Sequence, residues 1–556
     1  MIAEQPIPIY TTLSEVFGSV EASLPHAVRW NNLAEEFERR FGRKPQYIAR
    51  APGRVNLIGE HIDYALFGVL PAAIERDILI ACAPRLLNPS SPTAELENSP
   101  GSVVAENTQS KYTRQVFAPA IKNPQEVSDK AAHAESWHLE INPKELRWES
   151  YVKAGYYGVL NHHFSGGREL PVPVDLLVTG SVPAGSGLSS SAAMVVASTL
   201  AFLAVNGKLE NADDEEVLNK GGLVQLSMNN EKRVGVNSGG MDQAASVMSD
   251  PSSALYIVFY PSLSASAVPL PSSAVFVCAN SLVVADKVVG AKRGYNLRVV
   301  ETLVAARILA NSLGLEIGPQ DKITLREVVS KYSGEMEGED MGPSDLEKVL
   351  AVLEAKLDVL KPELPADGQF GVTMDEMIKM SGLSKDIFDE VYLSWVDVEA
   401  TYFQLFNRVK HVLSEARRVL LFRKTCLEAA SSADLNNKFF LEDLGRLMND
   451  SQSSCSQLYE CSCPELDQLT RLAREAGAYG SRLTGAGWGG CTISLVPENK
   501  VDEFIRKVRE TYPPYRGLEG NALSEVIFAT KPGRGACGKH DSSESLIIIS
   551  IYFFQC

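Results

Sequence analysis

The chain has 556 residues, of which 45% are hydrophobic, and its 53 Lys and Arg against 69 Asp and Glu give a net charge of −16. This length predicts more than one domain, and the apolar content is ample for packed cores. The composition excludes a disordered, collagen-like or disulfide-dense protein. The acidic balance argues against a nucleic-acid scaffold, because binding a polyanion needs a basic surface. A local basic pocket for a small anion is still compatible with it.

The cysteines indicate a reducing compartment. Nine of them are spread from Cys82 to Cys556, which is too sparse for a disulfide framework. Cys455, Cys461 and Cys463 are close together but lack the paired C-x2-C spacing of a structural zinc site. The N-terminus shows no signal-peptide pattern, and no stretch reaches the ~20 apolar residues that cross a bilayer. We therefore expect a cytoplasmic protein that makes no use of a membrane.

The first part of the chain predicts a helix followed by strands. Residues 1–27 form a polar arm, and a helix with helical spacing of apolar residues runs from Trp30 to near Gly42. Residues 47–83 alternate between strand-forming residues and turns. Residues 86–135 are rich in Ser, Pro, Asn and Glu without periodicity, which predicts a surface insertion between strands.

The rest of the chain mixes helices and strands. The expected elements are a helix over 149–164, a strand over 172–180, helices over 194–207 and about 214–232, strands over 481–496 and 524–531, and a helix over 502–512. The acidic segment 330–390 contains an amphipathic helix whose charges indicate a solvated face. Residues 395–475 are almost wholly helical in pattern.

A glycine- and serine-rich turn, PAGSGLSSSA, joins the strand over 172–180 to the next helix. Gly185 and Gly187 let the backbone approach a ligand closely, and the helix start presents unpaired N–H groups that favour a phosphate. The hydroxyls of Ser189, Ser190 and Ser191 can donate to phosphate oxygens or complete the shell of a Mg²⁺. The alternative is a serine-capped helix without a ligand. The turn matches neither a Walker A loop nor a Rossmann fingerprint, and protein-kinase signatures do not occur.

Two further segments carry polar or glycine-rich patterns. Residues 51–64, APGRVNLIGEHIDY, place Glu60, His61 and Asp63 where they can bind several vicinal hydroxyls, as selection of a sugar demands. A capped surface turn is the alternative for this segment. Residues 480–491, GSRLTGAGWGGC, form a glycine loop before a strand, and alone they are weak grounds for a ligand.

In this order, the three segments resemble the three motifs of the GHMP small-molecule kinases, and GRVNLIGEHIDY resembles the signature of their galactokinase branch, fungal type. The resemblance runs from about Arg50 to Lys531 and includes GGMDQ at 239–243. It implies an α+β fold of two domains with the active site in the cleft between them. The expected parts are an N-terminal arm at 1–27, an N-terminal domain at 28–265, a C-terminal domain at 266–532 and a disordered tail at 533–556.

The resemblance also implies an activity, the ATP-dependent phosphorylation of the C1 hydroxyl of D-galactose with Mg²⁺. Asp242 matches the catalytic aspartate of the family, and Arg54 matches the arginine beside it. The implied sugar-binding residues are Arg54, Glu60, His61, Asp63, Gly239, Asp242 and Tyr295. The implied nucleotide-binding residues are Gly185, Ser186, Gly187, Leu188, Ser189, Ser190, Ser191 and Ala192. The implied magnesium ligands are Ser191 and Glu231, and residues 485–490 shape the site from the C-terminal domain.

Two alternatives stay open. N-acetylgalactosamine kinases share GEHIDY and the stretch at Gly68–Pro71, and they differ in the room left around C2 of the sugar. Some fungal relatives are co-inducers that bind galactose and ATP and then contact a transcriptional repressor; the intact Ser-Ser-Ser-Ala-Ala run favours a kinase. The expected partners are therefore galactose and MgATP, without nucleic acid, and a repressor only if the chain is also a sensor. The tail contains LIIISIYFF, which has an aggregation-prone composition.

Overall fold

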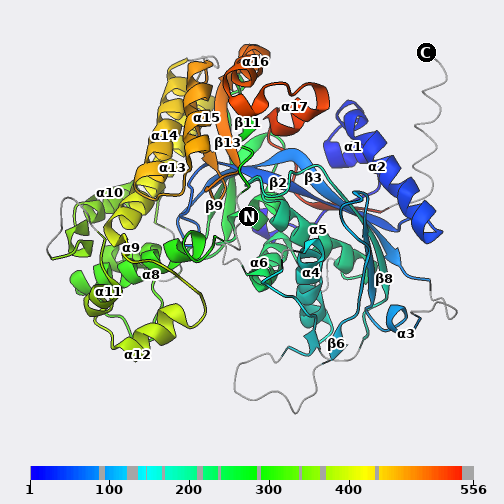
Figure 1. Cartoon of the computed structure of the whole chain (residues 1–556), viewed down its shortest axis with the longest axis horizontal. Coiled ribbons are helices and arrows are strands. Elements are labelled where there is room, and N and C mark those ends of the chain that lie inside the picture. Colours follow the sequence, from blue (N-terminus) through cyan, green and yellow to red (C-terminus); the bar gives the residue numbers. More distant parts are fainter. Residues whose placement is uncertain are drawn as a thin grey trace.

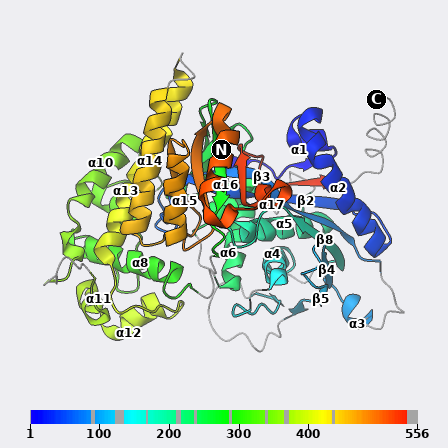
Figure 2. The same cartoon turned by 45° about the horizontal axis from the view of Figure 1, so that its top comes forward.

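The computed structural model describes residues 2–86, 94–121, 135–145, 147–165, 169–209, 217–235, 239–284, 290–336, 338, 341–363, 371–432 and 438–540. Two domains lie side by side, the N-terminal one around a mixed sheet and the C-terminal one rich in helices (Figure 1 and Figure 2). This agrees with the α+β fold expected from the sequence. Within the described ranges, no helix has both the length and the apolar character needed to cross a membrane.

The N-terminal domain is built on a seven-stranded sheet with the order β1-β15-β2-β3-β8-β4-β5. Its strands are β1 (Ile9–Tyr10), β2 (Tyr47–Ile58), β3 (Leu70–Pro84), β4 (Val103–Asn107), β5 (Gln115–Phe117), β8 (Val174–Gly180) and β15 (Cys537–His540). Smaller elements beside it are α1 (Leu13–Phe17), α3 (Ala94–Glu97), β6 (Ala120–Ile121), β7 (Trp137–His138), β9 (Ser253–Val258) and β10 (Ser264–Pro269).

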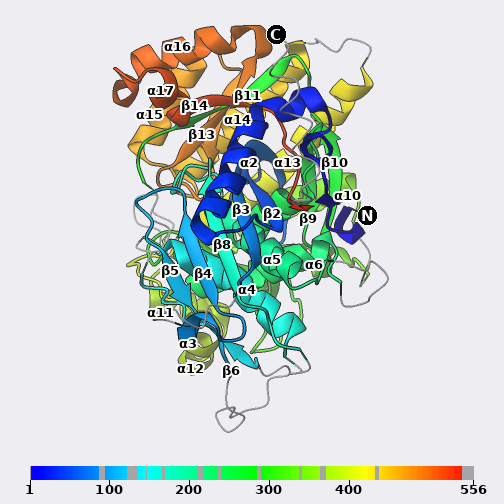
Figure 3. The ribbon, with the colours of Figure 1, turned by 90° about the vertical axis from the view of Figure 1, so that its right-hand side faces the viewer.

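Helices cover both faces of this sheet. On one face lie α4 (Trp148–His163), α5 (Ser190–Val205), α6 (Lys220–Glu231) and α7 (Met241–Met248). On the other face lies α2 (Val20–Phe41), which Figure 3 shows in front of the strands. The alternation of side chains along β2 separates two cores, because Ala49 faces the core that contains α5 whereas Ile48 packs with Trp30 and Leu33 of α2.

Helix α2 begins ten residues earlier than the sequence predicted. Ser19 caps it by accepting a hydrogen bond from the backbone N–H of Ala22, and Pro25 lies inside the helix. An interior proline costs about 3 kcal/mol or more, so a helix start after it was the natural expectation. Burial of the inner face of α2 against the sheet offsets this cost. The expected division between an arm at 1–27 and a domain from residue 28 therefore cuts through one helix.

The expected surface insertion at 86–135 is partly wrong. Its central segment forms β4, which pairs in parallel with β8 and antiparallel with β5 inside the main sheet. Val103, Val104 and Ala105 are buried there. A short strand that pairs with distant partners has no periodicity of its own to reveal it, and the polar residues around it dominated the pattern.

The expected disordered tail is also wrong for residues 533–540. The chain returns to the N-terminal domain, where β15 pairs with β2 on one side and with β1 on the other. Cys537 is fully buried in the core under α2, and the backbone carbonyl of Arg534 accepts a hydrogen bond from Arg50 at 2.8 Å. Residues 9–10 and 537–540 therefore lie side by side in one sheet. Residues 541–556, including the apolar run at 546–554, lie outside the described residues.

The C-terminal domain combines an antiparallel four-stranded sheet with long helices. The sheet order is β12-β13-β11-β14, with strands β11 (Ala274–Asn280), β12 (Gly480–Thr484), β13 (Cys491–Pro497) and β14 (Ile527–Thr530). The helices are α8 (Tyr295–Ser312), α9 (Leu325–Ser333), α10 (Pro343–Glu354), α11 (Met374–Ser381), α12 (Lys385–Phe388), α13 (Leu405–Ser431), α14 (Lys438–Gln457), α15 (Pro464–Glu475), α16 (Val501–Thr511) and α17 (Gly520–Val526). Helices α13 to α15 confirm most of the helical pattern expected over 395–475, whereas residues 395–404 and 458–463 are not helical.

The loop before α5 and the loop between β12 and β13 pack backbone against backbone at the junction of the two domains. A Cβ on Gly187 would lie 2.8 Å from the carbonyl oxygen of Thr484, and one on Gly485 would lie 2.3 Å from the carbonyl oxygen of Gly187. Both glycines also have positive φ, at 76° and 88°. Only glycine combines this conformation with so close an approach. The glycines of the two loops therefore position the domains against each other.

We expect deletion of β15 to destabilise the whole protein. A chain ending at Pro532 loses the pairing with β1 and β2, the buried Cys537 and the carbonyl that Arg50 contacts, whereas a chain ending at His540 keeps all of these contacts. Loss of such a set should lower the free energy of unfolding by about 3 kcal/mol or more. Chemical denaturation of the two truncated chains measures the difference. Equal stability of the two would contradict a structural role for β15.

We expect Gly187→Ala to be more harmful than Gly207→Ala. Both glycines have similar positive φ, 76° and 68°, so both substitutions carry a similar backbone strain of about 1–2 kcal/mol. Only at Gly187 does the new methyl group meet a backbone oxygen, because nothing lies within 4 Å of a Cβ on Gly207. The difference in unfolding free energy between the two variants isolates the contact between the loops. The contact is unimportant if the two variants unfold at the same denaturant concentration.

Candidate active site

A buried ion pair between Arg54 and Asp242 lies at the junction of the two domains. Arg54 is on β2, and Asp242 is in the first turn of α7. The Nε and Nη2 atoms of Arg54 lie 2.8 and 2.6 Å from Oδ1 of Asp242. The same guanidinium donates from Nη1 to the carbonyl oxygen of Gly187 at 2.6 Å. One side chain thus joins the predicted first motif, the predicted catalytic carboxylate and the glycine-rich loop.

A second carboxylate, that of Asp63, lies next to this pair. Its Oδ2 accepts a hydrogen bond of 3.4 Å from the backbone N–H of Met241, the residue before Asp242. Burial, and then the negative charge of Asp242, raise the pKa of Asp63 to about 6. Gly239 is needed for this approach, because a Cβ there would lie 2.7 Å from Cγ of Asp63. The structure therefore brings together four of the predicted residues: Arg54, Asp63, Gly239 and Asp242.

His61 and Tyr295 belong to an aromatic cluster beside these carboxylates. The ring of His61 lies 5.4 Å from Tyr295 and 5.6 Å from Trp488 between centroids. Its Nε2 lies 2.9 Å from the carbonyl oxygen of Ala486, which can only accept, so Nε2 carries the proton. Its Nδ1 lies 3.1 Å from the hydroxyl of Tyr64. Both ring nitrogens therefore contact protein groups in this structure.

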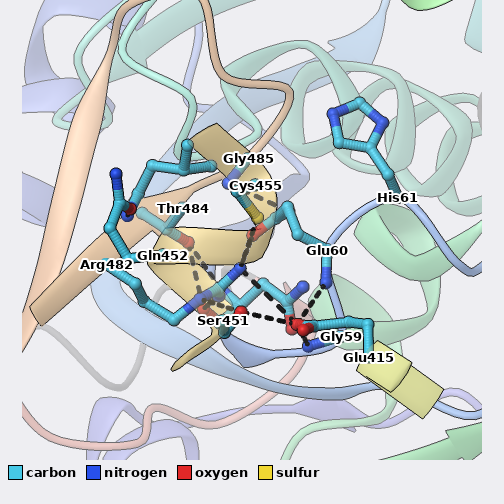
Figure 4. A network of polar contacts seen from close by, with 12 residues as sticks. Gly59, Glu60, His61, Glu415, Ser451, Gln452, Cys455, Arg482, Thr484 and Gly485 are labelled. Carbon is cyan, nitrogen blue, oxygen red and sulfur yellow. Dashed lines mark hydrogen bonds and ion pairs between the residues drawn. The ribbon is translucent and has the colours of Figure 1, made fainter. Parts of the chain in front are cut away.

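Glu60, by contrast, is directed into the C-terminal domain. Its Oε2 lies 3.0 Å from Nη2 of Arg482, and its Oε1 accepts a hydrogen bond of 3.2 Å from the backbone N–H of Gly485. Burial raises the pKa of Glu60 to about 7 against the opposing charge of Arg482. Figure 4 shows this carboxylate within a polar network and the imidazole of His61 pointing away from it. The neighbouring residues Glu60 and His61 thus face in different directions.

The glycine-rich loop has the features of an anion site. Ser189 occupies the N-cap position of α5 with φ 60°, and its side chain makes no capping hydrogen bond. Its Oγ is buried without a partner among the described residues. The serine-cap alternative therefore does not describe this residue. An orphaned hydroxyl beside an uncapped helix start suits a ligand that brings its own oxygens, such as a phosphate.

The other predicted residues of this loop differ in what they can offer. The hydroxyl of Ser186 already donates to the carbonyl of Pro183 at 2.7 Å, so it stabilises the turn. Leu188 and Ala192 are fully buried and belong to the packed interior, which leaves them only backbone groups for a ligand. Ser190 and Ser191 are half-buried in the first turn of α5.

The two predicted magnesium ligands lie on different helices. Ser191 is in the first turn of α5, and Glu231 ends α6. The carboxylate of Glu231 is buried and accepts a hydrogen bond of 2.5 Å from Gln243, the residue after Asp242. Among the residues described, no three His, Cys, Asp or Glu side chains are grouped so that they could hold a metal ion. Mg²⁺ commonly needs only one or two protein ligands when phosphates supply the rest, so this pair is compatible with it.

Sequence reasoning missed the residues that hold Glu60. Arg482 lies inside the third segment but was not singled out, and Glu415, His411 and Ser451 come from α13 and α14. These helices have the ordinary amphipathic pattern, in which buried polar residues carry no signal of their partners. The one available sign was Arg482 itself, because a charged residue in a strand expected to be buried, such as β12, needs a partner of opposite charge.

Comparisons with known proteins show which family this chain resembles. Family models match the galactokinase galactose-binding signature at residues 35–84, the N-terminal domain of GHMP kinases at 150–250 and their C-terminal domain at 433–514. The galactokinase of Dictyostelium discoideum is 37% identical over 92% of this chain and 93% of its own. That of Saccharomyces cerevisiae is 36% identical over 93% of this chain and 96% of its own.

A solved structure supports the fold. The crystal structure of Lactococcus lactis galactokinase complexed with galactose superposes with a TM-score of 0.60 at 23% identity, and covers 91% of this chain and 99% of the other. With three motif-bearing regions matched in order, and relatives above 30% identity along nearly the whole length, the chain belongs to the galactokinase family of GHMP kinases.

Proposed function

We propose that this protein is a galactokinase that transfers the γ-phosphoryl group of ATP to the C1 hydroxyl of D-galactose. The observation that carries the proposal is the buried Arg54–Asp242 pair, whose guanidinium also contacts the glycine-rich loop before α5. A carboxylate for the sugar hydroxyl and a helix start for the phosphates are thereby held next to each other. The names of the relatives over nearly the whole chain support galactose as the sugar.

Asp242 and Arg54 have different roles in the proposed reaction. Asp242 accepts a hydrogen bond from the C1 hydroxyl and takes its proton as the oxygen–phosphorus bond forms, while ADP leaves with the electron pair of the broken bond. The guanidinium of Arg54 stabilises the negative charge that grows on the transferred phosphoryl group. Because the pair is buried and fixed at 2.6 Å, both groups are in place before the sugar arrives.

The glycine-rich loop is the phosphate-binding element in this proposal. Gly185 and Gly187 bring the backbone close to the phosphates, and the N–H groups at the start of α5 face them. The orphaned Oγ of Ser189 and the half-buried hydroxyls of Ser190 and Ser191 are the donors on this side. Ser191 and Glu231 would hold the Mg²⁺ that accompanies ATP, and this ion neutralises phosphate charge when bound.

The sugar hydroxyls other than C1 face the first motif. In this proposal they contact Asp63, which accepts a hydrogen bond from the residue before Asp242, together with Gly239, Tyr295 and His61, and Glu60 is the remaining sugar-binding residue that the family resemblance implies. A carboxylate such as Asp63 accepts hydrogen bonds from two neighbouring hydroxyls, which is how one epimer is selected. The raised pKa of Asp63, about 6, leaves it ionised at neutral pH.

The alternatives are less well supported. The relatives described above are named for the galactokinase reaction, which favours an enzyme over a sugar-binding co-inducer and galactose over N-acetylgalactosamine. We also propose a cytoplasmic location, because the eight cysteines among the described residues are all free, as expected in a reducing compartment.

Purified protein with MgATP should phosphorylate galactose at least about tenfold more efficiently than N-acetylgalactosamine, since rejecting a substrate by pocket shape is worth about 1–3 kcal/mol, or roughly 10- to 200-fold. The measurement is kcat/KM for each sugar on one preparation, with the sugar 1-phosphate identified by NMR. Binding of galactose and ATP without any sugar phosphate would support the co-inducer instead. Faster turnover of N-acetylgalactosamine would move the protein to the other kinase branch.

We expect Asp242→Asn to lose about 100-fold or more in kcat, because an amide keeps the shape but accepts no proton and pairs poorly with Arg54. Its ATP affinity should stay within a few fold, since the nucleotide is held by the loop before α5. Kinetics and a nucleotide-binding titration on the same preparation test this. Near wild-type turnover would show that Asp242 is not the catalytic group.

A further inference from the structure

The turn at the end of β2 has an unusual backbone. Gly59 and His61, on either side of Glu60, have φ values of 106° and 60°, and His61 lacks the freedom of glycine. A non-glycine residue in this region is strained and keeps its conformation only where the surroundings hold it. The backbone conformation of this turn sets the direction of the His61 ring and the path of the chain toward Asp63.

Arg482 makes several of the contacts that hold the turn. It lies on β12 in the C-terminal domain and is fully buried. Its Nη2 is 3.0 Å from the Glu60 carboxylate, and its Nη1 donates to the carbonyl oxygen of Asn56 at 2.9 Å. Its Nε donates to the hydroxyl of Ser451 at 3.1 Å. The planar guanidinium on β12 therefore links the N-terminal domain to α14 through several hydrogen bonds at once (Figure 4).

Two residues of α13 complete this arrangement. Glu415 accepts hydrogen bonds from the backbone N–H of Gly59 at 2.9 Å and from the hydroxyl of Ser451 at 2.7 Å. Although burial raises its pKa, Arg418 and Arg482 lower the pKa of Glu415 below its usual value. Nε2 of His411 lies 3.0 Å from the carbonyl oxygen of Glu60, and burial lowers the pKa of this imidazole to about 4, so it is neutral.

We propose that Arg482 is a positioning residue for the sugar-binding end of the active site. From the C-terminal domain it holds the Glu60 carboxylate and the backbone of the turn, and thereby keeps His61 and Asp63 in the conformation that binds galactose. This inference rests on the proposed galactokinase activity. It makes the affinity for the sugar depend on a contact between the domains, whereas the hydrogen bonds of Arg54 to Asp242 and to Gly187 of the phosphate-binding loop involve neither Arg482 nor Glu60.

The charges explain why a neutral side chain cannot replace Arg482. In its absence Glu60 and Glu415 would be buried together, with Arg418 pairing only with Glu415. A buried carboxylate without its partner either takes up a proton or draws in water. Either outcome weakens the contacts that Arg482 and Glu415 make with the turn. His61 would then be free to leave its strained backbone conformation.

The test compares Arg482→Gln and Arg482→Lys with a matched control, Arg307→Gln. Arg307 is equally buried in the same domain, and it donates to Tyr392 and to the carbonyls of Gly318 and Asp321, away from the active site. For Arg482→Gln we expect the KM for galactose to rise about tenfold or more while the KM for ATP stays within about threefold. Arg482→Lys, which keeps the charge but not the fork, should show a smaller rise. The control should lose thermal stability without changing either KM.

A double-mutant cycle distinguishes positioning from a general loss of packing. If Arg482 acts through Glu60, Arg482→Gln in a Glu60→Gln background should raise the KM for galactose far less than it does in the wild type. Additive effects would overturn the proposal, as would an unchanged KM for galactose or an equal rise in both KM values. If Arg482→Gln fails to fold, the lysine variant carries the same test. A wild-type protein that does not phosphorylate galactose would instead refute the proposed function.

Discussion

The interaction on which the site depends is the contact of one buried guanidinium, that of Arg54, with Asp242 and with the backbone of the glycine-rich loop. Three segments far apart in the chain meet at this side chain. A buried arginine without partners would be very costly, so the contacts that satisfy Arg54 also fix the Asp242 carboxylate and the glycine-rich loop relative to each other. The contacts that stabilise Arg54 in the folded protein are therefore the same contacts that arrange the groups proposed for phosphoryl transfer.

A second constraint is the close packing of the domains through polar groups and glycines. Gly485 and Gly187 touch backbone to backbone, His61 contacts the carbonyl of Ala486, and Glu60 contacts Arg482. The first and second motifs of the family thus both contact the third. These contacts explain why the third segment is rich in glycine, because a Cβ at these positions would prevent the close approach of the two backbones.

The global charge of −16 opposes the binding of an anionic nucleotide, so local groups must supply the attraction. In the proposed site these groups are the uncapped start of α5, the serine hydroxyls and Arg54. Their partial and full positive charges act over a few ångströms in a partly buried site, where they are screened far less than charges on the surface. An acidic protein can bind a phosphate in this way without a basic surface.

The sequence by itself determined the family and the fold class: the order of the motifs, the Arg and Asp proposed as the catalytic pair, the glycine-serine turn before a helix and the mixed fold. These are local patterns, in which residue type and spacing express the requirement directly. The tertiary structure alone decided that β15 joins the first sheet, that β4 belongs to it, and that Arg482 holds Glu60. Each of these depends on partners more than 60 residues away, as with Glu60 and Arg482 422 residues apart, and no local pattern encodes such a pairing.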